Sequence, residues 1–263
     1  MPEIHADRLR LEQDGPLAVL TLAHPPLNLF DPKLMESLEA AIAAVAAAPP
    51  RGLLIRAEGR VVSGGVDVGQ VFDGLSVERA AELWERLLGL IHVLEDLPLP
   101  TVFAAHGLCL TAAFEVAMGC DLLVAAESAK FGLVEKVVGL TPSMGGTQRL
   151  AERAGPARAR EFVMTGDLYS AQTLERWNAV NVVLPDEGFD AAARAYAMRL
   201  ATGPTRAHAA TKAIVRAQLD GGVRAADAIV PERSGALFGT EDLQNAVRSF
   251  LTEGPGKATY EGR

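Results

Sequence analysis

The segment TAAFEVAMGCDLLVAA, residues 111–126, constrains the fold more than any other part of the chain. It is apolar almost throughout, yet Glu115 lies near its start. Together with the preceding strand it is long enough to suggest a membrane span, but His106, Glu115 and Asp121 favour a buried strand–helix–strand unit. An ionised carboxylate without a partner costs several kcal/mol in an apolar interior. Glu115 therefore either pairs with an Arg or Lys or serves a function.

Strands alternate with helices through the first half of the chain. Two β-rich runs at 8–14 and 17–23, separated by a Gly-Pro turn, predict a hairpin, and Asp31 followed by Pro32 predicts a helix start. Further strands are expected at 51–58, 101–105, 121–126 and 180–184, and further helices at 76–95 and 112–118. From Gly145 onward helical periods dominate. The alternation predicts an α/β fold with parallel strand pairing.

Composition excludes several classes of protein. The 263 residues carry a net charge of -8, whereas a general nucleic-acid binder presents a basic face. The five histidines form no metal-binding motif, so no metal is expected.

The cysteines and the N-terminus indicate the compartment. Cys109 and Cys120 lack CxxC spacing, which predicts buried thiols in a reducing compartment. Because the N-terminus shows no signal-peptide pattern, we expect a cytoplasmic protein without membrane association.

Two loops are candidates for chemistry. The first, GRVVSGGVDV at 59–68, has adjacent glycines that let the backbone approach a ligand, although a plain connecting loop looks the same. The second, AHGLCLTAAFEVAMGCD at 105–121, leads from a strand into a buried helix. The first N–H groups of that helix, around 111–113, lack intrahelical partners and could stabilise an oxyanion on a substrate carbonyl. Glu115 lies about one turn further along.

A second acidic candidate, Glu135, lies in AKFGLVEKVVGLTPSMGGTQRL, before a glycine-rich helix start. The alternative is an ordinary surface glutamate beside Lys136. By itself, the Glu-Lys pair favours the surface interpretation.

The order of these motifs resembles the crotonase superfamily, the enoyl-CoA hydratase/isomerase family. The likeness begins with HPPLNLFD, which looks like the family's first CoA-contacting turn, and continues through both loops, GGTQRL and MTGD to FLTEGPGKATYEGR. It implies an α/β fold whose core, residues 1–200, is a crotonase-like spiral of repeated ββα units. Residues 201–263 would form a C-terminal helical region that packs in a homotrimer or a dimer of trimers.

The resemblance also implies site residues. The family's two catalytic glutamates match Glu115 and Glu135, and its oxyanion-hole N–H donors match Val66 and Ala112. In the hydratases of the family the two carboxylates hold a water over C2=C3 of a 2-enoyl thioester. Glu115 would mainly activate that water and Glu135 would mainly handle the proton at C2. The substrate would be an acyl-CoA thioester, with coenzyme A as part of the substrate and no permanently bound cofactor.

Other positions follow from the same likeness. Expected substrate-binding residues are Leu27, Ser63, Gly64, Gly65, Asp67, Val68 and Ser143, and the basic groups expected near CoA phosphates are Arg60 and Lys257. The chain departs from the family at Val66, where alanine is usual, and at 111–113, where glycines are usual. Added β-carbons narrow the space around the thioester and resist positive φ, so we expect an altered local turn and an atypical acyl pocket.

Competing functions remain open from the sequence. A Δ3–Δ2 enoyl-CoA isomerase needs one carboxylate, at Glu135, and decarboxylases, hydrolases and non-catalytic CoA-binding homologues also use this scaffold. A serine hydrolase would have to use Ser143 or Ser63, neither of which lies in a G-x-S-x-G motif. No G-x-G-x-x-G follows a strand, which disfavours a dinucleotide enzyme.

Overall fold

A seven-stranded sheet organises the molecule in the computed structural model, which describes residues 4–263. Its strand order is β1-β2-β3-β4-β5-β7-β10, antiparallel between β1 and β3 and parallel from β3 to β10. The strands are β1 (Ile4–Ala6), β2 (Leu9–Asp14), β3 (Leu17–Leu22), β4 (Gly52–Ala57), β5 (Thr101–Ala105), β7 (Leu122–Ala126) and β10 (Val182–Leu184). The expected α/β architecture and the β2–β3 hairpin are confirmed.

A second, three-stranded sheet contains β6 (Leu108–Leu110), β8 (Lys130–Gly132) and β9 (Tyr169–Ser170). These strands were not predicted, because runs of two or three residues carry no period that distinguishes them from loops. The helices of the core are α1 (Pro32–Ala47), α2 (Val68–Val71), α3 (Val77–Asp96), α4 (Ala112–Gly119), η1 (a 3-10 helix, Glu135–Val138), α5 (Gly146–Ala154), α6 (Pro156–Thr165), α7 (Ala171–Arg176) and α8 (Phe189–Ala201).

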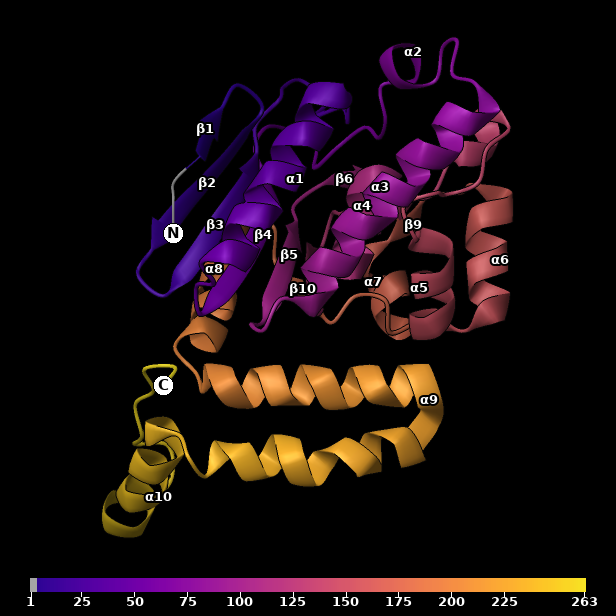
Figure 1. The fold of residues 1–263 in the computed structure, drawn as a ribbon. Helices are drawn as coiled ribbons and strands as arrows, with labels where there is room; N and C mark the ends of the chain where they lie inside the picture. Colours follow the sequence, from indigo (N-terminus) through magenta and orange to yellow (C-terminus); the bar gives the residue numbers. More distant parts are fainter. Residues whose placement is uncertain (1–3) are drawn as a thin grey trace.

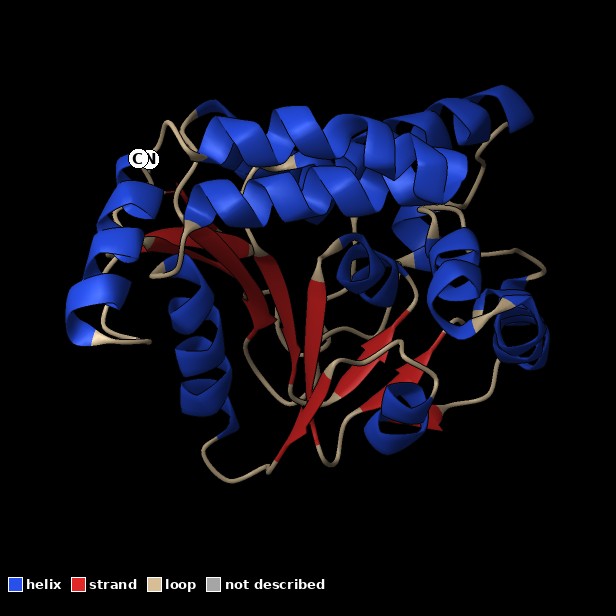
Figure 2. Ribbon diagram, turned by 90° about the horizontal axis from the view of Figure 1, so that it is seen from below, coloured by secondary structure: helices blue, strands red, loops and turns tan. Residues whose placement is uncertain are grey.

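The two sheets make the fold a spiral. The chain runs through a strand of the large sheet, then an extended segment of the small sheet, then a helix, as in β5–β6–α4. The preceding turn of the spiral repeats the pattern with β4, an extended segment at Ser63 that bridges Cys109, and α3. Helices lie on both sides of the twisted large sheet (Figure 2). Equivalent loops of successive turns are therefore brought next to each other.

Local sequence signals begin the helices of the core. Asp31 caps α1 by accepting a hydrogen bond from the Leu34 N–H at 2.8 Å, and Pro32 occupies the first helical position, as predicted. Ser76 caps α3 in the same way through the Arg79 N–H. Each cap satisfies a backbone N–H group in the first turn of its helix.

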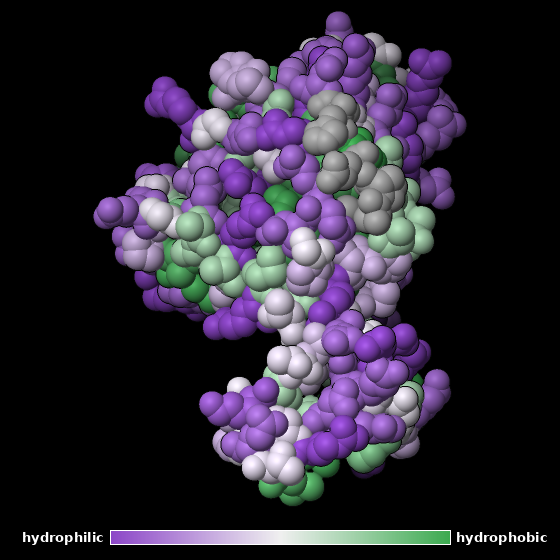
Figure 3. Space-filling model, turned by 90° about the vertical axis from the view of Figure 1, so that its left-hand side faces the viewer, coloured by the Kyte–Doolittle hydropathy of each residue, from purple (hydrophilic) through white to green (hydrophobic). Residues whose placement is uncertain are grey.

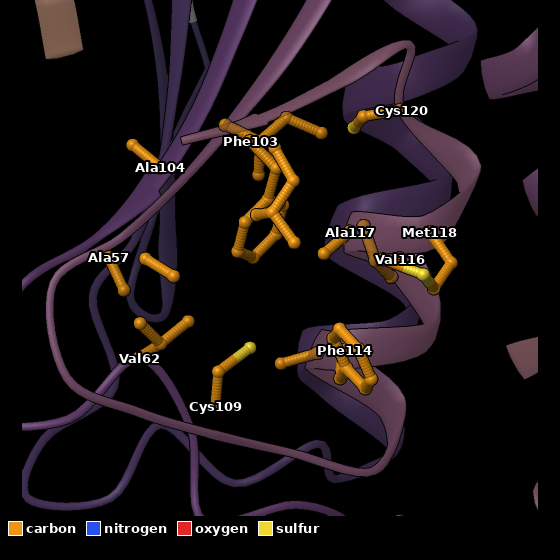
Figure 4. Packing of buried hydrophobic residues seen from close by; sticks show 14 of the residues in the cluster. Ala57, Val62, Phe103, Ala104, Cys109, Phe114, Val116, Ala117, Met118 and Cys120 are labelled. Atoms are coloured by element: carbon orange, nitrogen blue, oxygen red, sulfur yellow. The ribbon is translucent and has the colours of Figure 1, made fainter. Parts of the chain in front are cut away.

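Helix α4 crosses the centre of the core. All eight of its residues are buried, and Figure 4 shows Phe114 and Ala117 across from Cys109 on β6 and Phe103 on β5. Phe114 also packs against Phe131 of β8, with ring centroids 5.2 Å apart. A helix that is apolar on all sides is stable only when other elements surround it. Its position is therefore fixed by packing on both sheets.

The chain leaves the core after α8 and forms a C-terminal lobe of α9 (Thr205–Leu237) and α10 (Glu241–Glu253) (Figure 1). Helix α9 doubles back at Gly222, whose φ of 77° interrupts the helix. Figure 3 shows a narrow waist between the lobe and the core. Within residues 4–263, no helix has both the length and the apolar character needed to cross a membrane.

Ion pairs join the first arm of α9 to the core. Lys212 Nζ lies 2.8 Å from a carboxylate oxygen of Asp121 at the start of β7, and Arg216 lies 3.6 Å from Glu95 of α3. Helix α10 lies within the helical region expected at 201–263, although its bounds were not predicted. The chain after α10 returns to it, since the backbone N–H groups of Glu261 and Gly262 donate to the Asp242 carboxylate.

Candidate active site

Glu115 projects from the first turn of α4 and is 3% exposed. Its Oε1 accepts hydrogen bonds from the backbone N–H groups of Met144, at 2.8 Å, and Gly146, at 2.9 Å. Oε2 has no hydrogen-bond partner among the described residues. The salt-bridge interpretation of Glu115 is not supported, because the nearby Arg149 directs its guanidinium to Glu95 instead.

Burial decides the protonation of Glu115. It raises the pKa of the carboxyl to about 7, against the opposing effects of the Gly146 and Met144 N–H groups and the positive charge of Arg149. A group with a pKa near 7 is present in both protonation states at neutral pH, which suits it to proton transfer. The position of this carboxyl therefore has a chemical consequence beyond packing.

Glu135 begins the 3-10 helix η1 and is 9% exposed. Both of its carboxylate oxygens are buried without a hydrogen-bond partner within residues 4–263. Burial, followed by repulsion from the negative charge of Glu115, raises the pKa of Glu135 to about 7. The two carboxyls are thus close enough to interact, although they come from different elements, α4 and η1. The neighbouring Lys136 is exposed, and Glu135 is not the ordinary surface glutamate of the alternative interpretation.

The two candidate oxyanion loops lie against each other. The Ser63 N–H donates to the Leu108 carbonyl at 3.1 Å, and the Leu110 N–H donates to the Ser63 carbonyl at 3.2 Å. Further along, a Cβ added to Gly65 would lie 2.5 Å from Oγ1 of Thr111, so only glycine allows this approach. The residues that follow these two are Val66 and Ala112. The pairing of the loops therefore brings both expected amide donors to one place.

Both of these amides are available to a ligand. The bonds from the Phe30 N–H to the Gly65 carbonyl, 2.9 Å, and from the Asp67 N–H to the Phe30 carbonyl, 3.0 Å, leave the Val66 N–H between them unused. Ala112 is the first residue of α4, where an N–H has no intrahelical acceptor. In the described part of the chain, neither N–H donates to a protein acceptor. Both N–H groups are therefore free of protein acceptors, and their role as oxyanion donors stays a prediction.

The backbone at Thr111 retains a sharp turn. Its φ is 45° and its ψ is −120° although the residue is not glycine. An altered turn was expected from the sequence, because non-glycine residues resist positive φ. The positive φ is kept, and Thr111 bears the strain.

Sequence comparison identifies the family. The pattern described as "Enoyl-CoA hydratase/isomerase" matches residues 12–261. The chain belongs to the enoyl-CoA hydratase/isomerase family.

Individual relatives agree with this family. The "Probable enoyl-CoA hydratase" of Rhizobium meliloti (strain 1021) is 32% identical over 98% of this chain and 99% of its own length. The "Crotonyl-CoA hydratase" of Syntrophomonas wolfei is 29% identical over 93% of this chain and 95% of its own. The solved structure of enoyl-CoA hydratase subunit I from Geobacillus kaustophilus HTA426 superposes with a TM-score of 0.89 at 29% identity, covering 97% and 98% of the two chains. The expected crotonase-like fold is confirmed.

The residues expected to bind substrate in this family fall into two groups. Leu27, 45% exposed, and Val68, 44% exposed, present apolar side chains to solvent. Ser63 is buried, and its hydroxyl donates to the Asn28 carbonyl at 2.8 Å and accepts from the Gly65 N–H, so it supports the loop from within. Direct substrate contact by these residues stays a prediction.

Three further expected positions shape the surrounding backbone. The Gly64 N–H donates to the Leu27 carbonyl at 2.8 Å. Asp67 caps α2, and hydrogen bonds from the backbone and side chain of Gln70 lower the pKa of its carboxyl. The Ser143 hydroxyl donates to the Thr141 carbonyl at 2.8 Å, immediately before the Met144 N–H that binds Glu115.

One of the two basic residues expected near CoA phosphates lies in the core and the other lies in the C-terminal lobe. Arg60 is exposed in the loop after β4. Lys257 is exposed after α10, between Gly256 and Ala258, which line a groove of the C-terminal lobe. Phosphate binding by either residue stays a prediction.

Sequence reasoning missed three residues that organise the site. Met144 and Gly146 provide the N–H groups that hold Glu115, and Arg149 buttresses that turn by donating to the Gly145 carbonyl at 3.3 Å. All three lie in or beside GGTQRL, the motif that carried the family resemblance. Its two glycines before a helix start were a signal for N–H groups facing a buried acid.

Proposed function

We propose that the chain hydrates a 2-enoyl-CoA thioester to the 3-hydroxyacyl-CoA. Glu115 accepts a proton from water as the water oxygen bonds to C3, and Glu135 delivers a proton to C2. The thioester oxygen, which gains negative charge as water adds, accepts hydrogen bonds from the Val66 and Ala112 N–H groups. Before the next turnover the proton on Glu115 passes to Glu135 or exchanges with solvent. The product has then gained one hydroxyl and one hydrogen, and both glutamates are back in their starting protonation states.

The main support is the pairing of two buried carboxyls. The pKa values of Glu115 and Glu135 are both raised to about 7, and the charge of Glu115 contributes to the shift at Glu135. Like charges in one buried site disfavour simultaneous ionisation, so near neutral pH the pair holds about one proton. One group then acts as base and the other as acid, which is what addition of water across a double bond requires. Hydratases named among the relatives add to this support.

The experiment is a mass-spectrometric screen of short, medium and branched 2-enoyl-CoAs. A gain of 18 Da that depends on the enzyme is the expected result. Incubation in H₂¹⁸O should add two further mass units, because the new hydroxyl derives from water. Turnover of none of the thioesters would contradict the proposed function.

A Δ3–Δ2 enoyl-CoA isomerase is the second candidate, favoured by one observation. Glu135, unlike Glu115, has both carboxylate oxygens buried without a hydrogen-bond partner in the described residues, as a single base shuttling a proton would need. A 3-enoyl-CoA incubated in ²H₂O would then be converted to the 2-enoyl-CoA and gain deuterium, without the addition of water to the thioester. The hydratase proposal predicts a 3-hydroxy product from the 2-enoyl-CoA instead.

We also propose that the C-terminal lobe packs against other copies of the chain, as the family resemblance implies. Large apolar side chains on the lobe are exposed, with Phe238 at 71%, Phe250 at 60% and Leu251 at 77%. A monomer rarely exposes such residues in a contiguous patch. Light scattering coupled to size-exclusion chromatography should give the mass of a trimer or hexamer, and a monomer at micromolar concentration would contradict this.

A further inference from the structure

Thr111 has a backbone conformation that suits glycine. Its φ of 45° with ψ of −120° is disfavoured for a β-branched residue, whose Cβ substituents clash with the backbone there. Strain of this kind persists only where the surroundings impose it, and it concentrates at functional sites. A glycine would form the same turn without strain, so the side chain itself needs an explanation.

The hydroxyl of Thr111 has no partner. Thr111 occupies the N-cap position of α4, where a threonine ordinarily accepts a hydrogen bond from the first helical turn, but it makes no such bond. The residue is 7% exposed, and its Oγ1 is buried without any hydrogen-bond partner within residues 4–263. Buried hydroxyls in native proteins are almost always satisfied by protein, water or ligand.

The hydroxyl lies between the two oxyanion loops. Its Oγ1 is 2.5 Å from the position of a Cβ on Gly65, the residue before Val66. On its other side Thr111 is bonded directly to Ala112. The unpartnered hydroxyl is thus flanked by the two residues whose main-chain N–H groups are also unpartnered.

We propose that the Thr111 hydroxyl is a third hydrogen-bond donor to the substrate's thioester oxygen, beside the amides of Val66 and Ala112. This inference rests on the proposed function, because it requires a thioester carbonyl in the site. In this role the O–H of Thr111 donates to the oxygen on which negative charge develops when water adds at C3. Its contribution is greater in the transition state than in the bound substrate, so it acts on kcat more than on KM.

Two matched variants test the donor. Thr111→Val keeps the branched shape and removes the hydroxyl, whereas Thr111→Ser keeps the hydroxyl and removes a methyl group. We expect Thr111→Val to lose about 10²-fold in kcat with little change in KM, and Thr111→Ser to retain most of the activity. A Thr111→Val enzyme with wild-type kcat would overturn the proposal, as would a Ser variant as impaired as the Val variant.

A second measurement is independent of turnover. Butyryl-CoA labelled with ¹³C at the thioester carbon cannot be hydrated, and its carbonyl stretch moves to lower frequency with each added hydrogen bond. The shift on binding should be large in wild type and Thr111→Ser and smaller in Thr111→Val. Equal shifts in all three proteins would overturn the role of Thr111 alone. A wild-type protein that does not bind butyryl-CoA would overturn both the role and the proposed function.

Discussion

Glu115 and Gly146 fit together only because the glycine lacks a side chain. A Cβ at Gly146 would lie 2.7 Å from Cγ of Glu115 and 3.2 Å from its Oε1. The same glycine donates its N–H to that oxygen at 2.9 Å. Contact and hydrogen bond together fix the carboxyl, so the helix start at α5 positions a group on α4.

Replacing this glycine should displace the carboxyl. We expect Gly146→Ala to lower kcat by about 10²-fold, because a shift of about 1 Å in a reacting group has effects of that size. Gly89→Ala is the matched control, since Gly89 lies in helix α3 with nothing within 4 Å of an added Cβ. That control should stabilise the protein by about 0.5–1 kcal/mol and leave kcat unchanged. Equal kcat values for the two variants would show that Gly146 does not position Glu115.

The ion pair between Arg149 and Glu95 should dominate the stability of this region. Nε and Nη2 of Arg149 donate to the two carboxylate oxygens of Glu95 at 2.7 and 2.6 Å, and Arg149 is 7% exposed. Arg149→Leu leaves Glu95 without its main partner, and urea denaturation should show a loss of about 3 kcal/mol. Arg149→Lys keeps the charge but not the bidentate geometry and should lose less. A Leu variant within about 0.5 kcal/mol of wild type would contradict this.

The pH dependence of kcat/KM should be bell-shaped around neutral pH. The pKa values of Glu115 and Glu135 are both raised to about 7, and catalysis requires one carboxylate and one carboxylic acid. The rate should fall below pH 6 as both groups protonate and above pH 8 as both ionise. The two apparent values belong to the pair, not to either residue alone. A value of kcat/KM that stays the same between about pH 5.5 and pH 8.5 would contradict the paired mechanism.

Glu135 should also make folding stability depend on pH. Its folded-state pKa of about 7 lies above the ordinary value of 4.5, so the folded protein binds this proton more tightly than the unfolded chain does. The stabilisation is complete below pH 4.5 and is lost as the pH rises to 7. Glu135→Gln removes this dependence, and its stability relative to wild type should rise by about 3 kcal/mol between pH 4.5 and pH 8. Guanidinium titrations at both pH values measure this, with the exposed Glu253→Gln as control, and a difference independent of pH would contradict it.

Much of the core was predictable because its signals are local. The Asp31-Pro32 start of α1, the β2–β3 hairpin and the apolar run of α4 each follow from residues adjacent in sequence. The strand expected at 180–184 is present but shorter, as β10. The burial of Glu115 also follows from its neighbours, because a helix that is apolar on all sides has no face suited to solvent.

The organisation of the site was not predictable from local signals. Whether Glu115 is held by an arginine or by main-chain N–H groups depends on Met144 and Gly146, which lie 29 and 31 positions further along the chain and reach α4 through the spiral. The chain around Glu135 carries the same Glu-Lys pattern as an exposed surface, and only tertiary packing buries it. Thr111 adopts a positive φ that is disfavoured for a β-branched residue, and its hydroxyl has no partner in the described residues. Neither feature has a local sequence signal.

The central claim is that two carboxyls share the addition of water, and one measurement tests it directly. Hydration of crotonyl-CoA by wild type, Glu115→Gln and Glu135→Gln should be followed by loss of the enoyl-thioester absorbance, with circular dichroism confirming that all three are folded. Each variant should lose 10²–10⁴-fold in kcat, because each removes one partner of the proton transfer. A variant of either glutamate that hydrates crotonyl-CoA at the wild-type rate would contradict the paired mechanism.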